Sequence, residues 1–319
     1  MHHVLMHHHH LLAAAAGAGH THAPPISYFQ GVVLGLLQGV TELFPISSLG
    51  HTVLFPTLFG WTRLVKAQSN PESFWLAFVV MLHVGSALGL LAYYWRDWIK
   101  IIRAWIATLR TRRVETTDQR LAWLIIVASI PTGIIGLLAE HPVRVALARP
   151  LAAASFLLVN GLMLLGAEIL RRRSDRRVAS VGASAELAGA RPIEAVSYRE
   201  AATVGVAQSV GLIAGMSRDG SVMSYGLVRG LNHEAAARFS FLLATPIILA
   251  AGVFKLPDLL GPLGDGIRGQ SLVAAAAAAV AAVVSVAFLV RWFRTRTLWP
   301  FGTYCILFGA AMVVYLTVG

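Results

Sequence analysis

Charged residues and cysteine are scarce in this chain of 319 residues. Asp, Glu, Lys and Arg make up 13% of it and hydrophobic residues 56%, whereas a soluble domain carries roughly 25% charged residues. The low charge therefore excludes an ordinary soluble globular protein. Cys305 is the single cysteine, so an intramolecular disulfide is excluded too, and cysteine usage says nothing about the redox compartment.

Acidic residues are fewer than basic ones, 15 against 26, and the formal net charge is +11. Such an excess can indicate nucleic-acid binding, but the arginines gather between apolar runs, where the positive-inside rule explains them. We therefore predict no nucleic-acid partner. Two arginine-rich stretches, read here as loops over 96–120 and 171–199, should lie on the cytoplasmic side. This orientation places both termini and the mouth of the first polar break, described below, outward.

The chain is rich in long apolar runs. A helix of about 20 residues crosses a hydrocarbon core of about 30 Å, and six runs are long enough: about 74–95, 121–139, 151–170, 237–255, 272–292 and 299–318. We predict an all-α integral membrane protein with these six transmembrane helices. Residues 1–26 hold a His-rich stretch that we interpret as a disordered or tag-like extension and leave out of the fold.

Two further apolar segments, about 27–59 and 201–231, are interrupted by Gly, Pro, Ser and charged residues. A break at membrane depth is tolerated only where it is buried in protein or lines a wet cavity, so both are predicted to be re-entrant helical hairpins. Gly35, Gln38 and Val40 recur 170 positions later as Gly205, Gln208 and Val210. Three spans follow each hairpin, and an odd number inverts the second half relative to the first. The predicted organisation is a repeat over 27–170, a basic cytoplasmic loop over 171–200 and an inverted repeat over 201–319.

The first break contains the sequence QGVTELFPISSLGH, residues 38–51. Gln38 and Glu42 are four apart and share one helix face, and Ser47, Ser48 and His51 follow. A carboxylate, a hydroxyl and an imidazole can supply a metal ligand or base, a nucleophile and a proton carrier. Alternatively, the serines cap a helix and Gln38 joins two helices by a hydrogen bond. A carboxylate inside a membrane costs about 2.5–3.5 kcal/mol, which favours a function for Glu42.

The second break contains GMSRDGS, residues 215–221. Arg218 suits bidentate binding of a phosphate, and backbone N–H groups at the start of the following helix would add to an anion site. The alternative is an ion pair of Arg218 with Asp219 or Glu42 that only locks the hairpins together. A pair with Glu42 would itself bring the two motifs into one site.

Three other polar residues lie in apolar spans. For His83, lining the same cavity and bonding to a neighbouring helix stay equally open. For Asn160 and Glu168, a packing or headgroup role is favoured.

The first motif resembles the signature (E/Q)GxTEFLPVSSxGH of the bacitracin-resistance-type undecaprenyl-diphosphate phosphatases, and GMSRDGS resembles their second signature, PGxSRSGxT. The resemblance covers residues 27–318. It implies an enzyme that dephosphorylates undecaprenyl diphosphate on the outer face of the bacterial inner membrane with a divalent cation, Mg²⁺ or Ca²⁺, and so recycles the lipid carrier of peptidoglycan synthesis. The implied partners are a polyprenyl diphosphate lipid and the bilayer, and a homodimer is left open.

The resemblance also implies residue roles. Glu42 would serve as metal ligand or base, with Gln38 beside it at a position that is Glu or Gln in the family. Ser48 would be the nucleophile, His51 a proton carrier or phosphate contact, and Arg218 the diphosphate clamp. The implied substrate-binding residues are Gln38, Ser47, Ser217, Asp219, Gly220 and Ser221.

The chain departs from the second signature at Ala214, Asp219 and Val222. Asp219 would repel a diphosphate or, with a cation present, add an oxygen ligand, and Val222 would lack one hydroxyl contact to phosphate. A weakly active paralogue therefore stays an alternative. A transporter of polyprenyl phosphate is another, because inverted repeats with broken helices are common in secondary transporters. The carboxylate, serine and histidine confined to one hairpin favour the hydrolase.

Overall fold

The computed structural model describes residues 25–68, 73–147, 149–180 and 191–318, except for the side chains of 140–147 and 177–180. Nearly all of the predicted extension 1–26 lies outside these residues. The described part is α-helical, with no strand assigned in it. Its helices are α2 (Tyr28–Thr41), α3 (Ser48–Leu58), α4 (Thr62–Gln68), α5 (Trp75–Tyr93), α6 (Trp95–Thr111), α7 (Thr117–Leu147), α8 (Pro150–Ser180), α9 (Tyr198–Gln208), α10 (Arg218–Val228), α11 (His233–Leu260), α12 (Arg268–Trp292) and α13 (Trp299–Val318), with short 3₁₀ turns η1 (Ile193–Ala195), η2 (Ser209–Leu212) and η3 (Pro262–Gly264).

Six of these helices, α5, α7, α8, α11, α12 and α13, are long and apolar enough to cross a membrane. They coincide with the six predicted spans, so the prediction of a multi-pass all-α membrane protein is confirmed. Helix α8 continues to Ser180, well past the predicted end at 170. The first ten residues of the predicted basic loop therefore belong to a helix.

The prediction of a loop over 96–120 is wrong for most of its length, because α6 occupies Trp95–Thr111. Its basic residues recur at helical spacing, as at Arg96, Lys100 and Arg103. Ile101 is buried on one face of the helix and Ile102 is exposed on another. The charge of these residues is typical of a loop beside a membrane, whereas their period along the chain indicates a helix with one polar face.

The two interrupted segments consist of two short helices each, α2 with α3 and α9 with α10. Both first helices begin with a capping box, from Ser27 in α2 and from Ser197 in α9. Both second helices begin after a serine whose hydroxyl accepts a backbone N–H two residues inside the helix, Ser47 for α3 and Ser217 for α10. Side-chain caps of this kind satisfy N–H groups that have no partner within a helix, which allows helices to begin at the breaks.

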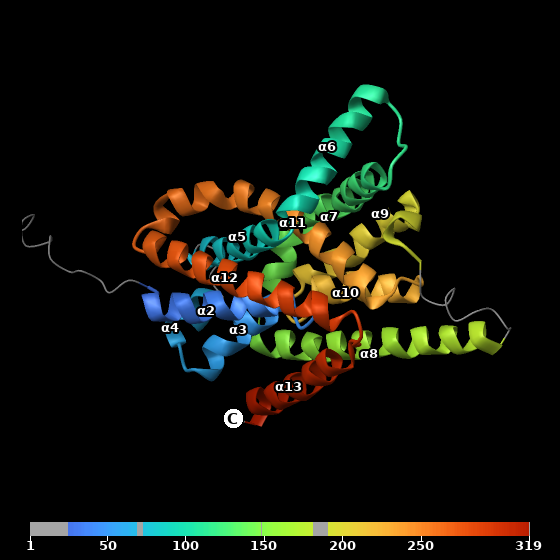
Figure 1. Cartoon of the computed structure of the whole chain (residues 1–319). Coiled ribbons are helices and arrows are strands. Elements are labelled where there is room, and N and C mark those ends of the chain that lie inside the picture. Colours follow the sequence, from blue (N-terminus) through green and yellow to red (C-terminus); the bar gives the residue numbers. More distant parts are fainter. Residues whose placement is uncertain (1–24, 69–72, 148, 181–190, 319) are drawn as a thin grey trace, which may run out of the picture.

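Each broken segment packs along a span from the other half of the chain, α2 on α12 and α9 on α7; Figure 1 shows α2 and α12 side by side. Glycines make these contacts close. A Cβ on Gly35 would lie 2.2 Å from the carbonyl oxygen of Ala274, and one on Gly205 would lie 2.2 Å from that of Ala128. Small residues permit this approach of backbones in membrane helices. The re-entrant and inverted character of the halves stays a prediction.

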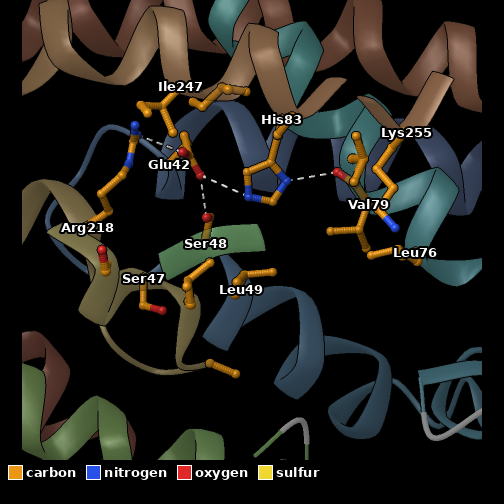
Figure 2. A pocket seen from close by; sticks show the side chains of 18 of the residues that line it. Glu42, Ser47, Ser48, Leu49, Leu76, Val79, His83, Arg218, Ile247 and Lys255 are labelled. Carbon is orange, nitrogen blue, oxygen red and sulfur yellow. Dashed lines mark hydrogen bonds and ion pairs between the residues drawn. The ribbon is translucent and has the colours of Figure 1, made fainter. Parts of the chain in front are cut away.

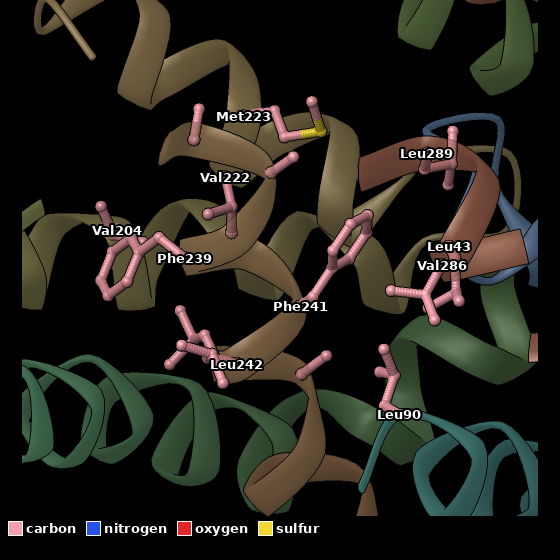
Figure 3. Close-up of a cluster of buried hydrophobic side chains, with 14 of the residues drawn as sticks. Leu43, Leu90, Val204, Val222, Met223, Phe239, Phe241, Leu242, Val286 and Leu289 are labelled. Atoms are coloured by element: carbon pink, nitrogen blue, oxygen red, sulfur yellow. The ribbon is translucent and has the colours of Figure 1, made fainter. Parts of the chain in front are cut away.

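A buried apolar cluster lies between α10, α11 and α12 and supports the breaks from behind (Figure 3). Phe239 and Phe241 of α11 are almost fully buried in it, together with Val222 and Met223 of α10. Dense apolar packing resists small displacements. The cluster therefore fixes α10, whose first residue is Arg218.

Candidate active site

A cavity of about 760 Å³ lies where the two breaks meet, and α5, α7 and α11 supply its other walls. Five of the predicted site residues line it: Glu42, Ser47, Ser48, Ser217 and Arg218. Figure 2 shows four of them, Glu42, Ser47, Ser48 and Arg218. The other five do not line it: Gln38, His51, Asp219, Gly220 and Ser221. The structure thus divides the predicted set into residues that face the cavity and residues that stand behind it.

Glu42 and Arg218 join the two breaks directly. Glu42 caps the C-terminal end of α2 and is buried. Its Oε1 accepts a hydrogen bond from Nη2 of Arg218 at 2.9 Å. Nη1 of Arg218 is buried and, among the described residues, has no hydrogen-bond partner. The acid of one motif and the guanidinium of the other therefore share one site, and one guanidinium nitrogen is left for a ligand.

The second carboxylate oxygen of Glu42 contacts three side chains. Oε2 accepts a short hydrogen bond from Oγ of Ser48 and one of 3.0 Å from Nε2 of Gln38, and it lies 3.4 Å from Nε2 of His83. Ser48 is the first residue of α3. A carboxylate that accepts the proton of a serine hydroxyl is the arrangement of a base with its nucleophile.

Ser47 fixes the geometry of the first break. Its φ of 71° is unusual for a residue other than glycine. Its Oγ accepts the N–H groups of Gly50 at 3.2 Å and of Gly215 at 3.1 Å. One hydroxyl therefore caps α3 and ties the first break to the second. Strained backbone of this kind costs on the order of 1–3 kcal/mol and gathers at functional sites.

Asn160 of α8 makes a second bridge between the breaks. Its Nδ2 donates to the carbonyl oxygen of Pro45 at 2.9 Å, and its Oδ1 accepts the N–H of Ser217 at 3.0 Å. Asn160 is fully buried, so its amide has the expected packing role. The segments that it joins are the two motifs themselves. Glu168 lies farther along α8 and accepts from the N–H of Leu298 at 2.7 Å, away from the cavity.

His51 and His83 have different surroundings. His51 lies behind the cavity, with Nδ1 2.7 Å from the carbonyl oxygen of Ser47 and Nε2 2.7 Å from the hydroxyl of Tyr304. His83 lines the cavity, and its Nδ1 donates to the carbonyl oxygen of Val79 at 2.8 Å. Because a carbonyl oxygen only accepts, Nδ1 carries a proton, and Nε2 faces the carboxylate of Glu42. His83 is thus the imidazole that reaches the cavity.

Two of the three departures from the second signature, Asp219 and Val222, do not line the cavity. Asp219 is buried; its Oδ1 accepts from Oγ of Ser240 at 2.9 Å and lies 3.2 Å from Nη2 of Arg218. Val222 belongs to the apolar cluster of Figure 3, so the expectation that its lost hydroxyl removes a phosphate contact is wrong. Ala214 lines the cavity. Asp219 therefore acts on Arg218 from behind.

Polar residues that the motifs do not include also line the cavity, among them Gln68, Arg149, Gln208 and Lys255. Gln208 donates to the carbonyl oxygen of Ala128 at 3.2 Å, and its match with Gln38 in the repeat was the one sequence signal that pointed to it. Gln68 is the last residue of α4, Lys255 lies in the last third of α11, and Arg149 directly precedes α8. No motif marks them, since they reach the cavity only through the packing of α4, α8 and α11.

The described residues fit a divalent cation that is shared with a phosphate. They contain no group of three or more His, Cys, Asp or Glu side chains that could hold a metal. However, Oε1 of Gln38 is buried without a hydrogen-bond partner, next to the carboxylate of Glu42. Mg²⁺ is usually held by one or two carboxylates together with phosphate oxygens and water. Gln38 and Glu42 could supply two protein oxygens of such a set.

Comparisons with known proteins point to one family. The family model described as bacitracin resistance protein BacA matches residues 31–311. The chain is 49% identical to a protein of Frankia alni named undecaprenyl-diphosphatase 2, over 91% of this chain and 98% of that protein. It is 48% identical to an undecaprenyl-diphosphatase of Mycolicibacterium paratuberculosis, with the same two coverages, and 40% identical to one of Acidiphilium cryptum, over 90% of this chain and 98% of that protein.

Proposed function

The chain belongs to the bacitracin resistance protein BacA family, and from this premise we propose that it hydrolyses undecaprenyl diphosphate to undecaprenyl monophosphate and inorganic phosphate. The observation that carries the proposal is the meeting of Glu42, Ser48 and Arg218 in one cavity. We further propose a place in the bacterial inner membrane with the cavity opening outward, because the arginine-rich stretches favour the cytoplasmic side. There the reaction recycles the lipid carrier of peptidoglycan synthesis.

In the proposed reaction, Oγ of Ser48 attacks the distal phosphorus of the diphosphate. Glu42 takes the proton of the hydroxyl, a bond forms between Oγ and phosphorus, and the anhydride bond breaks to release the lipid monophosphate. Glu42 gives this proton up, by way of His83, to the departing lipid monophosphate and is a base again. Water then attacks the phosphoserine, Glu42 takes one proton of the water and returns it to Oγ of Ser48, and the bond between phosphorus and Oγ breaks to free inorganic phosphate. The contact of Ser48 Oγ with Glu42 Oε2 supports this assignment. His83, 3.4 Å from the same oxygen, is placed to pass the proton onward.

Positive charge at the same point stabilises the phosphoryl oxygens. Nη1 of Arg218 is without a partner among the described residues and can donate to the distal phosphate. Helices α3 and α10 both begin at the cavity, with Ser48 and Arg218 as their first residues. The N-terminus of a helix carries partial positive charge and free N–H groups. Preorganised donors of this kind favour the charge that develops in the transition state.

We propose that Gln38 and Glu42 hold Mg²⁺ or Ca²⁺ when the lipid is bound. The cation would supply further neutralisation of the phosphate oxygens. Gln38 also orients Glu42 through its Nε2, so it has a role whether or not a cation is present. A homodimer stays a prediction.

Release of phosphate from undecaprenyl diphosphate by the purified protein in detergent tests the proposal. We expect release with Mg²⁺, loss of release with a chelator, and loss in Ser48→Ala. Ser155→Ala is a matched control, because Ser155 is an exposed hydroxyl on α8 that bonds only to its own helix and does not line the cavity. Wild-type release in Ser48→Ala would reject the assignment. Movement of polyprenyl phosphate across sealed vesicles without phosphate release would favour a transporter.

A further inference from the structure

Two glycines of α7, Gly133 and Gly136, line the cavity although no neighbour requires glycine there. A Cβ added to either would meet nothing within 4 Å. At Gly35 and Gly205, by contrast, a Cβ would collide with the backbone of a packed helix. Glycine in a helix interior costs roughly 0.5–1 kcal/mol relative to alanine. Helix packing explains the second pair of glycines and does not explain the first.

Small residues also face the cavity from α11, where Ala250 and Ala251 line it. Beyond them the lining reaches Leu137 of α7 and Phe254 of α11, which are 68% and 62% exposed. Both helices are membrane spans, so exposed apolar side chains on them face lipid. The cavity therefore reaches from Glu42 and the motifs to the lipid-facing surface between α7 and α11.

We propose that this opening, bounded by Gly133, Gly136, Ala250 and Ala251, is the portal through which the prenyl tail of the substrate leaves the cavity for the bilayer. The inference rests on the proposed phosphatase function and names the part of the site that binds the tail. A cavity of about 760 Å³ lies in the range that holds a drug-sized ligand. It admits the diphosphate and the first isoprene units, and the rest of an eleven-unit tail must lie outside.

An opening toward lipid also fits the energetics of the substrate. A long prenyl chain that leaves the bilayer would expose apolar surface to water, at about 25 cal/mol per Å². Passage between two spans keeps the tail in apolar surroundings throughout. Each isoprene unit carries a branching methyl group, so the gap has to be wide, and the absence of a Cβ on α7 provides that width.

Polar side chains line the cavity as well, among them Gln68, Arg149 and Lys255, and Lys255 also lies 3.7 Å from Asp258. Such groups suit the charged diphosphate, whereas the prenyl tail needs the apolar gap between α7 and α11.

Narrowing the portal tests the inference. We would compare Gly133→Val and Gly136→Leu with the wild type on undecaprenyl diphosphate and on farnesyl diphosphate, whose three-unit tail can lie inside the cavity. We expect kcat/KM for the long substrate to fall by at least about tenfold and that for the short one to change by less than about twofold. Gly166→Leu is the matched control, because a Cβ at Gly166 of α8 also meets nothing within 4 Å but Gly166 does not line the cavity.

Further measurements separate the outcomes. Melting temperatures show whether the variants fold. If Gly133→Val and Gly136→Leu do not fold, Gly133→Ala and Gly136→Ala, which a helix favours, should show the same selective loss at a smaller size. An unchanged ratio of long to short substrate in folded variants would overturn the portal. Binding of undecaprenyl monophosphate is measured in parallel. If the wild type binds this lipid without hydrolysing the diphosphate and only the portal variants weaken binding, the portal stands and the phosphatase proposal fails; equal binding in portal and control variants overturns the portal.

Discussion

The two broken segments share a scaffold and differ in chemistry. A Cβ added to Gly35 or to Gly205, 170 positions apart, would lie 2.2 Å from a carbonyl oxygen of a span of the opposite half. Ser47 and Ser217, separated by the same number of positions, both cap the helix that follows the break. The residues that maintain the backbone path are thus those that agree between the halves.

The reacting groups occupy positions where the halves disagree. Glu42 corresponds to Leu212, and Ser48 corresponds to Arg218; all four line the cavity. The first break supplies a base and a nucleophile, and the second supplies an apolar wall and a cation. A shared backbone with unequal side chains lets one site hold opposite charges, which a symmetric pair of breaks could not do.

The largest expected effect is at Glu42, whose counterpart in the second break is Leu212. Glu42→Gln removes the base and should lower kcat by about a thousandfold, within the range for general base catalysis. Leu212→Met keeps the volume of the corresponding wall residue and should leave the rate within about twofold. Phosphate release under saturating lipid measures both. Retention of more than about a tenth of the rate in Glu42→Gln would contradict the unequal roles of the breaks.

The two histidines give the next effect. His83→Gln should reduce kcat by at least about tenfold, because it removes the imidazole beside Glu42, with little change in melting temperature. His51→Gln should instead lower the stability by about 1–3 kcal/mol, because its two buried contacts are lost, while the folded protein keeps its activity. Rates normalised to folded protein separate the two. The reverse pattern would return His51 to the reaction.

The capping serines offer a smaller, structural comparison. Ser217→Ala removes one cap and should cost about 1 kcal/mol of stability. Ser47→Ala should cost about twice as much, because its hydroxyl also accepts the N–H of Gly215 from the other break. Melting temperatures in the same detergent give the difference. Equal losses would mean that the bond between the breaks contributes nothing.

The smallest effect concerns the capping boxes at the start of the two segments, where the third residue is Gln30 in one and Glu200 in the other. Arg191, hydrogen-bonded to Glu200 at 2.7 Å, lowers the pKa of that carboxyl below its ordinary 4.5. A lowered pKa stabilises the fold above the unfolded-state value, and the gain is lost as the pH falls from there through the folded-state pKa. Melting curves between neutral pH and pH about 3 should therefore decline more steeply for the wild type than for Glu200→Gln. Parallel curves would remove Glu200 from the acid dependence.

The sequence alone predicted the six spans and the shared site of Glu42 and Arg218. The length of the apolar runs identifies the spans. A buried acid and a buried guanidinium inside a membrane are each costly unless they pair, which brings Glu42 and Arg218 together. The choice between His51 and His83 could not be predicted, because Tyr304, 253 residues away from His51, holds the His51 side chain behind the cavity. Helix α6 was missed because its charges were assigned to a side of the membrane before their period was considered.

The central claim is that the two breaks bind one phosphate group between them. An experimental structure with a bound phosphate analogue such as vanadate, at the wild-type site, tests it most directly. We expect the analogue to contact Oγ of Ser48 and Nη1 of Arg218 at once. An analogue bound only to residues of one break, with the side chain of the other turned away from it, would show that the breaks do not form one phosphate site.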